Sequence, residues 1–214
     1  MYVPTAFRVE DRAPLHALMR RHSFATLVTA GEEPFVTHLP LLVDAAPGAD
    51  GDDGTLIGHF ARPNPHWQLD HARHVSVAIF HGPHAYISPS WYRSGSPAVP
   101  TWNYATVHAW GKLSLLANPA DVAAVLARTL AVFESPVPMP WANPLPREAM
   151  DKLIASVVAF RMPIDRVEGK FKLGQNRAVA DQVGAIEGLE ASGDTESKSL
   201  AMFAREHLGH PPAR

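Results

Sequence analysis

Residues 24–43 read FATLVTAGEEPFVTHLPLLV, and they give the clearest indication of the chain's architecture. Its two apolar parts, residues 24–29 and 34–43, are rich in β-branched and aromatic residues, which predicts two strands. Gly31 and the glutamates after it form a polar break between the two parts, where we expect a tight turn. Strands joined by so short a turn are antiparallel. The stretch therefore predicts a β-hairpin.

The rest of the chain continues this hairpin order. Gly111 indicates a bulge in a long strand, and Pro163 indicates an edge strand because proline has no N–H for a ladder. A doubly wound sheet would require strands and helices to alternate along the chain, and they do not. We therefore expect a barrel of about six or seven antiparallel strands, with flanking and C-terminal helices, in the mainly β or α+β class. The other predicted strands are 55–60, 75–80, 85–88, 104–116 and 160–167, and the predicted helices are 10–22, 118–134, 147–159, 177–190 and 195–208, with a short one within 62–73.

The chain is expected to form one domain with an extension. Residues 1–176 would make the barrel domain, with the helices at about 118–134 and 147–159 inserted into it. Residues 177–214 would form a C-terminal helical extension of the same domain. A polar Asp/Gly loop at 44–54 and a proline-rich connector at 136–146 separate predicted elements.

The composition limits the classes of function. The 214 residues are 46% hydrophobic and 19% charged, which is typical of a globular protein with a real core. The formal net charge of -2 gives little electrostatic drive toward nucleic-acid phosphates. The chain has no cysteine, which excludes disulfides and thiolate metal sites. Neither a signal peptide nor an apolar run of about 20 residues is present, so we expect a cytoplasmic protein that does not enter a membrane.

Six of the 12 histidines fall between residues 59 and 84. His71 and His74 would share a helix face, which is compatible with a metal site. However, the spacings match no standard zinc pattern and HExxH is absent, so we expect no metal. His59 and His84 are better explained as neutral hydrogen-bond partners near a polar ligand. The chain also lacks GxGxxG, P-loop and GxSxG motifs, which disfavours classical phosphate cradles and hydrolase sites.

Aromatic residues gather beside Gly/Pro turns. Trp110 lies inside a predicted strand, where core packing explains it. Trp67, Trp91 and Trp102 have polar neighbours, so they suit the wall of a pocket for a planar heterocycle, although core packing explains them equally well.

The segment 170–177, KFKLGQNR, concentrates polar donors. Lys170 and Lys172 lie on the same side if the segment is extended, and Gln175 and Arg177 precede a helix. This arrangement indicates an anion site at a helix N-terminus. The alternative is an ordinary solvated helix entry.

Six runs spread along the chain form one specific pattern. They are MYVPTAF at the start, THLPLL at 37–42, GHFARPNPHW at 58–67, GPHAYISPSWY at 82–92, VPTWNYATVHAWG at 99–111 and KFKLGQNR at 170–177. Through these runs the chain resembles the PaiB-type FMN-binding negative transcriptional regulators across nearly its whole length. Gly174 departs from the family pattern, which usually has serine there and so one more hydroxyl donor.

The resemblance implies an FMN-binding split β-barrel like that of pyridoxamine-phosphate oxidases and flavin reductases, with FMN in a cleft of a homodimer. Backbone groups of residues 37–40 would run along the flavin, and the turn after residue 60 would hold the phosphate. There Pro65-His66 replaces the usual Arg-Lys pair, so Arg62 or the lysines of segment 170–177 would supply the positive charge. The residues expected to bind FMN are Thr37, His38, Leu39, Pro40, His59, Phe60, Asn64, His66, Trp67, Trp102, Asn103, Tyr104, Lys170, Lys172 and Gln175.

Three functions are compatible with the sequence. The first is an FMN-binding regulator, as the family name implies, although no helix-turn-helix pattern is present and direct DNA binding stays open. The second is a flavin-dependent oxidoreductase or flavin reductase, for which no catalytic acid or base can be named. The third is a histidine metalloprotein.

Overall fold

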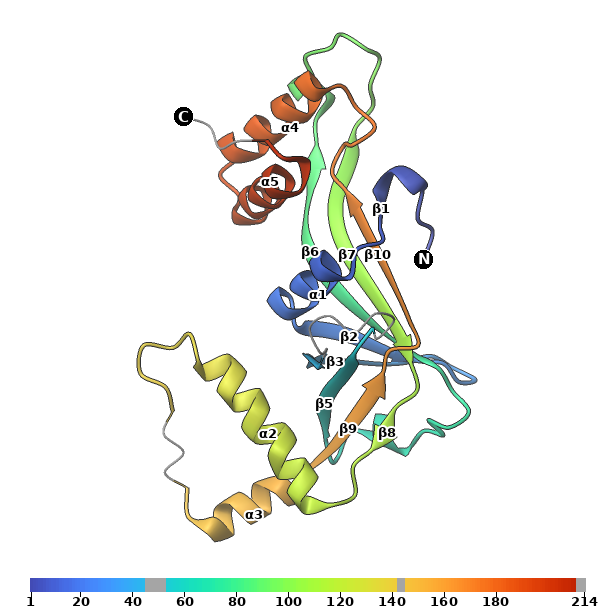
Figure 1. The fold of residues 1–214 in the computed structure, drawn as a ribbon, viewed down its shortest axis with the longest axis vertical. Coiled ribbons are helices and arrows are strands. Elements are labelled where there is room, and N and C mark those ends of the chain that lie inside the picture. The colour runs from blue at the N-terminus through green and yellow to red at the C-terminus, as the bar shows by residue number, and fades with distance from the viewer. Residues whose placement is uncertain (45–52, 142–144, 211–214) are drawn as a thin grey trace. The chain divides into compact units, whose positions relative to one another are not determined.

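The computed structural model describes residues 1–44, 53–141 and 145–210. These residues form a mixed α+β fold of ten strands in antiparallel sheets with five α-helices (Figure 1). The predicted fold class is confirmed. There are ten strands rather than six or seven, because the predicted strands 34–43 and 104–116 each divide into two and the strands at 8–9 and 166–172 were not predicted, while those predicted at 75–80 and 85–88 are one strand. The elements are η1 (Thr5–Phe7), β1 (Arg8–Val9), α1 (Arg12–Arg21), β2 (Phe24–Thr29), β3 (Phe35–Pro40), β4 (Leu42–Asp44), β5 (Thr55–Ala61), η2 (Pro65–Gln68), β6 (Ser76–Ile87), η3 (Pro89–Trp91), β7 (Thr101–Gly111), β8 (Ser114–Leu115), α2 (Pro119–Glu134), α3 (Arg147–Ala155), β9 (Val157–Pro163), β10 (Arg166–Lys172), α4 (Val179–Ala191) and α5 (Thr195–Leu208).

The chain forms two compact units, each assembled from distant segments. Unit 1 contains residues 1–18, 81–107 and, of the described chain, 168–210; unit 2 contains residues 19–80 and 108–167. The division of the sequence at residue 176 stays a prediction. Most of the predicted polar loop, residues 45–52, and part of the proline-rich connector, residues 142–144, lie outside the described residues.

Unit 2 is built on the predicted hairpin. Strands β2 and β3 pair from Phe24 opposite Pro40 to Thr29 opposite Phe35, which confirms the hairpin. On its other side β2 pairs with the first half of β6, so the local strand order is β6-β2-β3. A second sheet has the order β4-β5-β9-β8.

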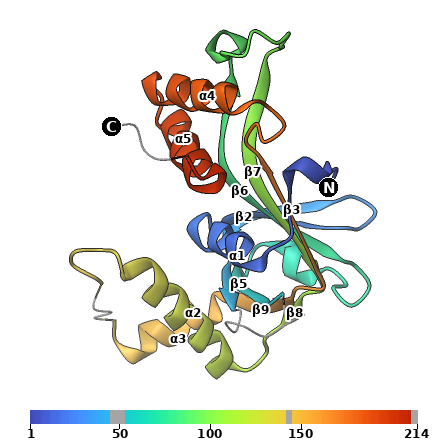
Figure 2. The same ribbon diagram turned by 45° about the horizontal axis from the view of Figure 1, so that its top comes forward.

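Helices α2 and α3 lie side by side in both ribbon views (Figures 1 and 2). The residue Asn118 begins α2, since its side-chain oxygen accepts a hydrogen bond from Ala120 N, and Pro119 suits the first helical position. The buried face of α2 presents Val122 and Val125 to Ala159 of β9. Packing of this apolar face holds α2 against the second sheet.

Two predictions about the segment before residue 172 are wrong. The helix predicted to reach residue 159 ends at Ala155, because the apolar run from Val157 pairs along β5 instead. The final strand is not an edge strand, because β9 lies between β5 and β8. Pro163 is tolerated as the last residue of β9, where a missing N–H costs little. The strand β10, which follows it, was not predicted.

Two further differences concern β6 and Trp110. The two strands predicted at 75–80 and 85–88 are one continuous strand, β6. Glycine is needed at position 82 of this strand, because the Cβ of any other residue would lie 2.9 Å from Ala105 O, closer than side chains normally approach. Trp110 is only half-buried, and the Arg166 guanidinium stacks 3.7 Å from its ring. Trp110 therefore packs beneath a cation rather than in the core.

Unit 1 contains the strand order β1-β10-β7-β6 and the predicted helices α4 and α5, which lie side by side. Asp194 caps α5 by accepting from Glu196 N and Ser197 N, and Gly209 ends it with a positive φ of 69°. In α4, a Cβ on Gly184 or Gly188 would collide with Trp91, so these glycines let η3 pack directly on the helix. No helix among the described residues is long and apolar enough to span a membrane.

Candidate functional site

A chain of hydrogen-bonded side chains runs through unit 2 and centres on His66, which is completely buried. Its Nε2 lies 2.7 Å from Thr29 Oγ1, and its Nδ1 lies 2.7 Å from Thr37 Oγ1. Thr29 Oγ1 continues to Ser76 Oγ at 2.6 Å, and Asn64 Nδ2 donates to Thr37 Oγ1 at 3.1 Å. We call these five residues the His66 network. It joins β2, β3, β6 and the turn η2.

The sequence of η2 explains why His66 turns inward. Asn64 is the N-cap of this turn, and its Oδ1 accepts from His66 N at 3.0 Å. Pro65 occupies the first helical position, where its fixed φ is favourable. The cap and the proline together aim the His66 ring into the space between Phe35 and Phe60, at centroid distances of 4.8 and 4.9 Å.

Burial makes His66 a neutral side chain. Burial, and to a smaller extent the neighbouring His71, lowers the pKa of His66 to about 4. His71 lies 6.2 Å away between ring centroids, and burial lowers its pKa as well. His66 therefore carries no charge at neutral pH, and both of its ring nitrogens are used within the protein.

The His66 network holds β3 in place at the end of its sheet. Among the described residues β3 pairs with β2 alone, so the outer backbone groups of residues 37–40 take part in no ladder. Leu39 faces the core, whereas the exposed His38 places its Nδ1 3.1 Å from Thr26 Oγ1. Pro40 ends the strand. The outer edge of β3 thus presents alternating backbone donors and acceptors, apart from the nitrogen of Pro40.

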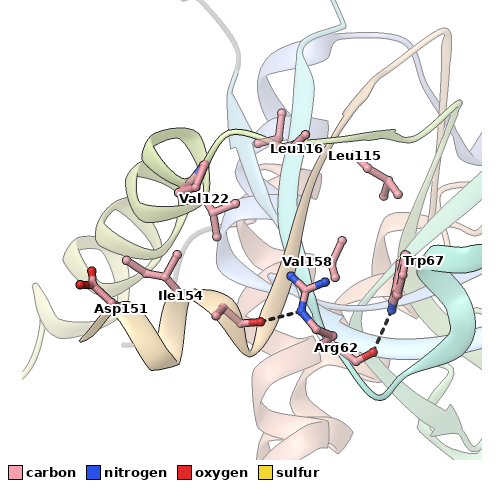
Figure 3. A pocket seen from close by; sticks show the side chains of 11 residues that line it. Arg62, Trp67, Leu115, Leu116, Val122, Asp151, Ile154 and Val158 are labelled. Carbon is pink, nitrogen blue, oxygen red and sulfur yellow. Dashed lines mark hydrogen bonds between the residues drawn. The ribbon is translucent and has the colours of Figure 1, made fainter. Parts of the chain in front are cut away.

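Strand β5 and the turn after it carry three more of the predicted residues. His59 is half-buried, and burial lowers its pKa. Phe60 is buried and stacks on Phe160 at 4.7 Å, so its ring belongs to the core. Trp67 donates its Nε1–H to Arg62 O at 2.8 Å, and both residues border a pocket (Figure 3).

In unit 1, Lys170 is a nearly buried cation. Its side chain is only 7% exposed, and Nζ donates to Tyr2 O at 3.2 Å. The ammonium lies 5.3 Å and 5.2 Å from the ring centroids of Tyr2 and Tyr104. The two π faces compensate part of the cost of burying the charge.

Lys172 lies two residues further along β10, which places both lysines on one side of the strand. Its Nζ donates to Thr101 Oγ1 and to Trp102 O at 2.6 Å. Burial, and then the nearby charges of Lys170 and Arg177, lower the pKa of Lys172. Within the described chain neither lysine has a carboxylate partner, so an anion bound here would relieve the repulsion.

The remaining predicted residues of unit 1 have different surroundings. Trp102 is 55% exposed and lies near Tyr86, whereas Asn103 is buried. Gln175 accepts from Leu173 N at 2.8 Å and donates to Phe171 O, so its amide braces the turn after β10. The amide of Gln175 is therefore already used within the chain.

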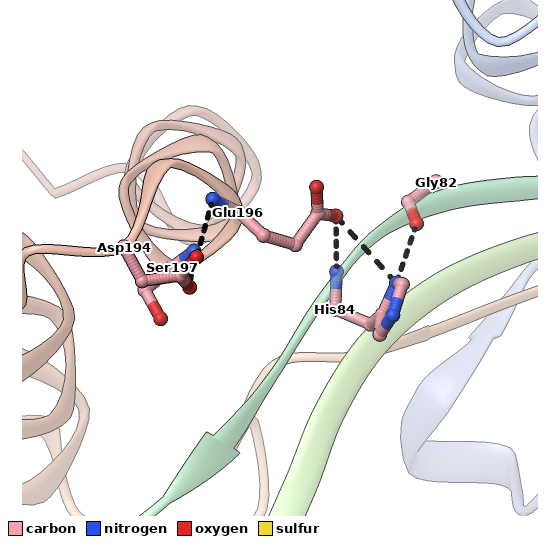
Figure 4. A network of polar contacts seen from close by, with 5 residues as sticks. All are labelled: Gly82, His84, Asp194, Glu196 and Ser197. Atoms are coloured by element: carbon pink, nitrogen blue, oxygen red, sulfur yellow. Dashed lines mark hydrogen bonds and ion pairs between the residues drawn. The ribbon is translucent and has the colours of Figure 1, made fainter.

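His84 connects β6 to the start of α5. Its backbone N–H donates to Glu196 Oε1 at 3.1 Å, and its Nδ1 lies 3.5 Å from the same oxygen (Figure 4). Glu196 follows the cap residue Asp194, whose pKa is lowered chiefly by the hydrogen bond from Ser197.

Across residues 1–44, 53–141 and 145–210, no three His, Cys, Asp or Glu side chains are grouped as metal ligands.

The structure thus gathers the predicted residues into two groups, one in each unit. Sequence reasoning missed Thr29, Ser76 and Phe35, which surround His66, and Tyr2, which packs on Lys170. Ser76 carries a weak signal, since it is a polar residue in the otherwise apolar predicted strand 75–80, whereas Thr29 shares its strand with Thr26. Their pairing across β2 and β6 is visible only in the fold.

Comparisons with known proteins agree on the family. The family model described as "Putative FMN-binding domain" matches residues 1–166. The Bacillus subtilis protein named "Protease synthase and sporulation protein PAI 2" is 33% identical over 211 residues, covering 97% of this chain and 98% of that protein. The uncharacterized protein AN0679 of Emericella nidulans is 28% identical over 244 residues, covering 96% and 97%. The flavocytochrome Anf3 from Azotobacter vinelandii has a similar fold, with a TM-score of 0.60 at 16% identity, over 78% of this chain and 70% of that one.

The residues present fit FMN. The outer edge of β3 offers alternating N–H and C=O groups, which complement the alternating carbonyls and N–H of a flavin pyrimidine ring. Separately, in unit 1, Lys170 and Lys172 offer positive charge without a carboxylate partner among the described residues, which suits an anion. The chain therefore belongs to the family of FMN-binding domains that this model describes, it is similar over its whole length to the PAI 2 protein, and its cofactor is FMN.

Proposed function

We propose that this protein is a PaiB-type regulator that binds FMN along the edge of β3 and acts on gene expression through a partner. The observation that carries the cofactor part is the His66 network, which fixes the free edge of β3 before any ligand arrives. A strand held in place loses little conformational entropy on binding, so its backbone groups form a prepared surface for a ring. The regulatory part is supported by the PAI 2 relative, whose name refers to protease synthesis and sporulation.

The proposal assigns separate tasks to the chain's residues. Backbone groups of residues 37–40 would bind the flavin ring, and Thr37 and Asn64 would keep that edge straight. That Lys170 and Lys172 also bind FMN is carried by the resemblance to the family alone. FMN itself supplies reversible electron chemistry when bound, whereas the protein supplies orientation and hydrogen bonds.

Charge argues against direct DNA binding by the C-terminal helices. Helices α4 and α5 with the cap residue Asp194 carry six carboxylates, but only two cations, Lys198 and Arg205. The guanidinium of Arg205 is paired with Glu190 at 2.7 Å. A surface of this sign repels phosphate backbones, so we propose that any effect on transcription passes through another protein.

We further propose that the protein is a homodimer. Tyr86 and Trp102 are 45% and 55% exposed and lie next to each other on β6 and β7 of unit 1. Neighbouring exposed aromatic side chains are typical of protein interfaces. A sedimentation experiment giving a monomer at micromolar concentration would contradict this part.

The test of the cofactor is spectroscopic. The purified protein should be yellow, or become yellow with added FMN, and release FMN when it is denatured. The Thr37→Val variant should bind FMN more weakly than wild type, while Thr195→Val, at the exposed start of α5, should not. A protein that stays colourless in the presence of FMN would overturn the proposal.

The same sample tests the alternative of an oxidoreductase. If reduced nicotinamide bleaches the bound FMN and a substrate restores the colour, the protein is an enzyme rather than a regulator of the proposed kind. A mobility shift of promoter DNA by the protein alone would contradict action through a partner.

A further inference from the structure

A pocket of about 620 Å³ lies within unit 2, apart from the edge of β3 (Figure 3). It is bordered by the start of α2, the end of α3, β8, β9 and the turn η2. Its volume falls in the range typical of small-molecule sites. Its wall is mostly apolar and contains Leu116, Val122, Ile154 and Val158.

Arg62 is the cation of this pocket, and it is held rigidly. Its Nε donates to Ala155 O and its Nη2 donates to Val157 O at 2.8 Å, which ties the guanidinium to the end of α3 and the start of β9. These bonds use two of the five N–H donors of an arginine. In the part of the chain that the structure describes, Arg62 makes no ion pair, and its remaining N–H groups have no partner.

An aromatic ring accompanies this cation. The guanidinium carbon of Arg62 lies 6.0 Å from the centroid of Trp67, whose orientation is fixed by the bond from its Nε1 to Arg62 O. Asp151 lies on the other side of the pocket, on α3 (Figure 3). Its side chain is largely exposed, and its Oδ2 lies 4.0 Å from Arg147 Nε. The pocket thus combines one fixed cation, one indole face and an apolar wall.

We propose that this pocket binds a small organic carboxylic acid. The carboxylate would accept from the free N–H groups of Arg62, and the aliphatic or aromatic body would lie against Trp67, Val122 and Ile154. A carboxylate carries one negative charge and matches one guanidinium in charge and in planar geometry. A phosphate monoester carries nearly two charges, and the carboxylate of Asp151 on the pocket wall would oppose it further. The ligand is therefore a carboxylate distinct from FMN, such as an effector of the proposed regulator.

The experiment is calorimetric titration of the full chain with benzoate and hexanoate, compared with the neutral isosteres benzamide and hexanamide. We expect at least one acid to bind at millimolar concentration or below and its amide to bind at least about tenfold more weakly, since the amide lacks the charge. Arg62→Gln should weaken the acid about 10- to 100-fold. Asp151→Asn should tighten binding a few-fold, since it removes a like charge from the pocket wall.

Controls separate loss of the site from loss of the fold. Arg128→Gln removes an exposed cation of α2 that does not border the pocket and pairs with Asp44 rather than Asp151, so it should leave the affinity for the acid nearly unchanged. Because Arg62 also supports α3, each variant is checked by circular dichroism and by FMN binding, which should persist. Asp151→Asn gives an independent test, since the loss of an exposed carboxylate does not threaten the fold.

Several outcomes would overturn the proposal. They are that neither acid binds, that acid and amide bind equally well, or that Asp151→Asn fails to tighten binding. Loss of FMN together with the acid in a folded Arg62→Gln protein would assign the pocket to the flavin instead. Failure of FMN binding in the wild type would overturn the proposed function but not this one, because the acid titration does not depend on FMN.

Discussion

Thr29 Oγ1 lies 2.7 Å from His66 Nε2 inside unit 2, and it is one of two hydroxyls that hold the imidazole. This relationship connects the middle of a predicted hairpin with a turn 37 residues later. It explains how a histidine can be completely buried in a protein interior, because each ring nitrogen has a hydroxyl partner. The same relationship yields the first prediction.

Thr29→Val removes the hydroxyl while nearly keeping the shape of the side chain. His66 Nε2 and Ser76 Oγ then lose a buried partner, which we expect to lower the free energy of unfolding by about 1–3 kcal/mol. Urea denaturation measures the change. Thr26→Val, on the more exposed side of the same strand, is the matched control and should cost less. Equal losses in the two variants would show that the His66 network adds no stability.

Acid should destabilise the protein before its carboxylates titrate. The pKa of His66 is about 4 in the folded chain and 6.5 in the unfolded chain, so the unfolded chain takes up a proton at higher pH. The contribution of the neutral, buried His66 to the free energy of unfolding is therefore complete above pH 6.5, and it is lost as the pH falls from about 6.5 toward 4. The difference between these values, at about 1.4 kcal/mol for each pH unit, sets an upper limit of about 3.5 kcal/mol.

Urea denaturation at a series of pH values tests this dependence, and the proton resonances of the His66 ring report its pKa directly. His66→Gln should flatten the curve between pH 6.5 and 4, whereas His38→Gln, on the exposed face of β3, should not. An ordinary titration of His66 near pH 6.5 would contradict the neutral, buried state described above.

Lys172→Met should distinguish FMN from riboflavin. If Lys172 contacts the phosphate, the variant should weaken FMN about tenfold or more by removing a charge-assisted hydrogen bond, and riboflavin should be unaffected. Quenching of flavin fluorescence measures both affinities. Lys198→Met, at an exposed position of α5, is a control of equal charge. Equal losses for FMN and riboflavin would show that Lys172 does not recognise the phosphate.

Gly188→Ala should weaken the attachment of η3 to α4. The added Cβ would collide with the Trp91 ring, so the ring or the helix must move. We expect a loss of about 1–3 kcal/mol, the usual cost of overpacking. Gly193→Ala has no atom within 4 Å of the added Cβ and should have little effect. Thermal denaturation compares the two, and an unchanged melting temperature for Gly188→Ala would mean that Trp91 is loosely held.

The strands and helices that depend on local pattern were predictable, whereas the contacts within the site were not. The β2–β3 hairpin and helices α4 and α5 follow from periodicity and turn residues close together in the sequence. Strand β10 was missed because its lysines suggest a solvated loop, while Lys170 is in fact covered by Tyr2 and Tyr104. No local pattern reveals a partner more than 60 residues away.

His66 shows the same limit at the level of one residue. The sequence places it in a motif expected to contact phosphate, and the fold buries its ring beside Phe35 and Phe60. Two hydroxyls supplied by β2 and β3 make that burial possible, and neither is near His66 in the sequence.

The matched family segment ends at residue 166, where β10 begins. Strand β1 obtains its ladder from β10, with Arg8 opposite Lys170. A protein shortened to residues 1–166 would leave the N-terminal strand with no neighbour and would lose Lys170, whose ammonium donates to Tyr2 O. Anyone who expresses this protein in parts should therefore keep β10, because Met1, Tyr2 and strand β1 all find their partners on it.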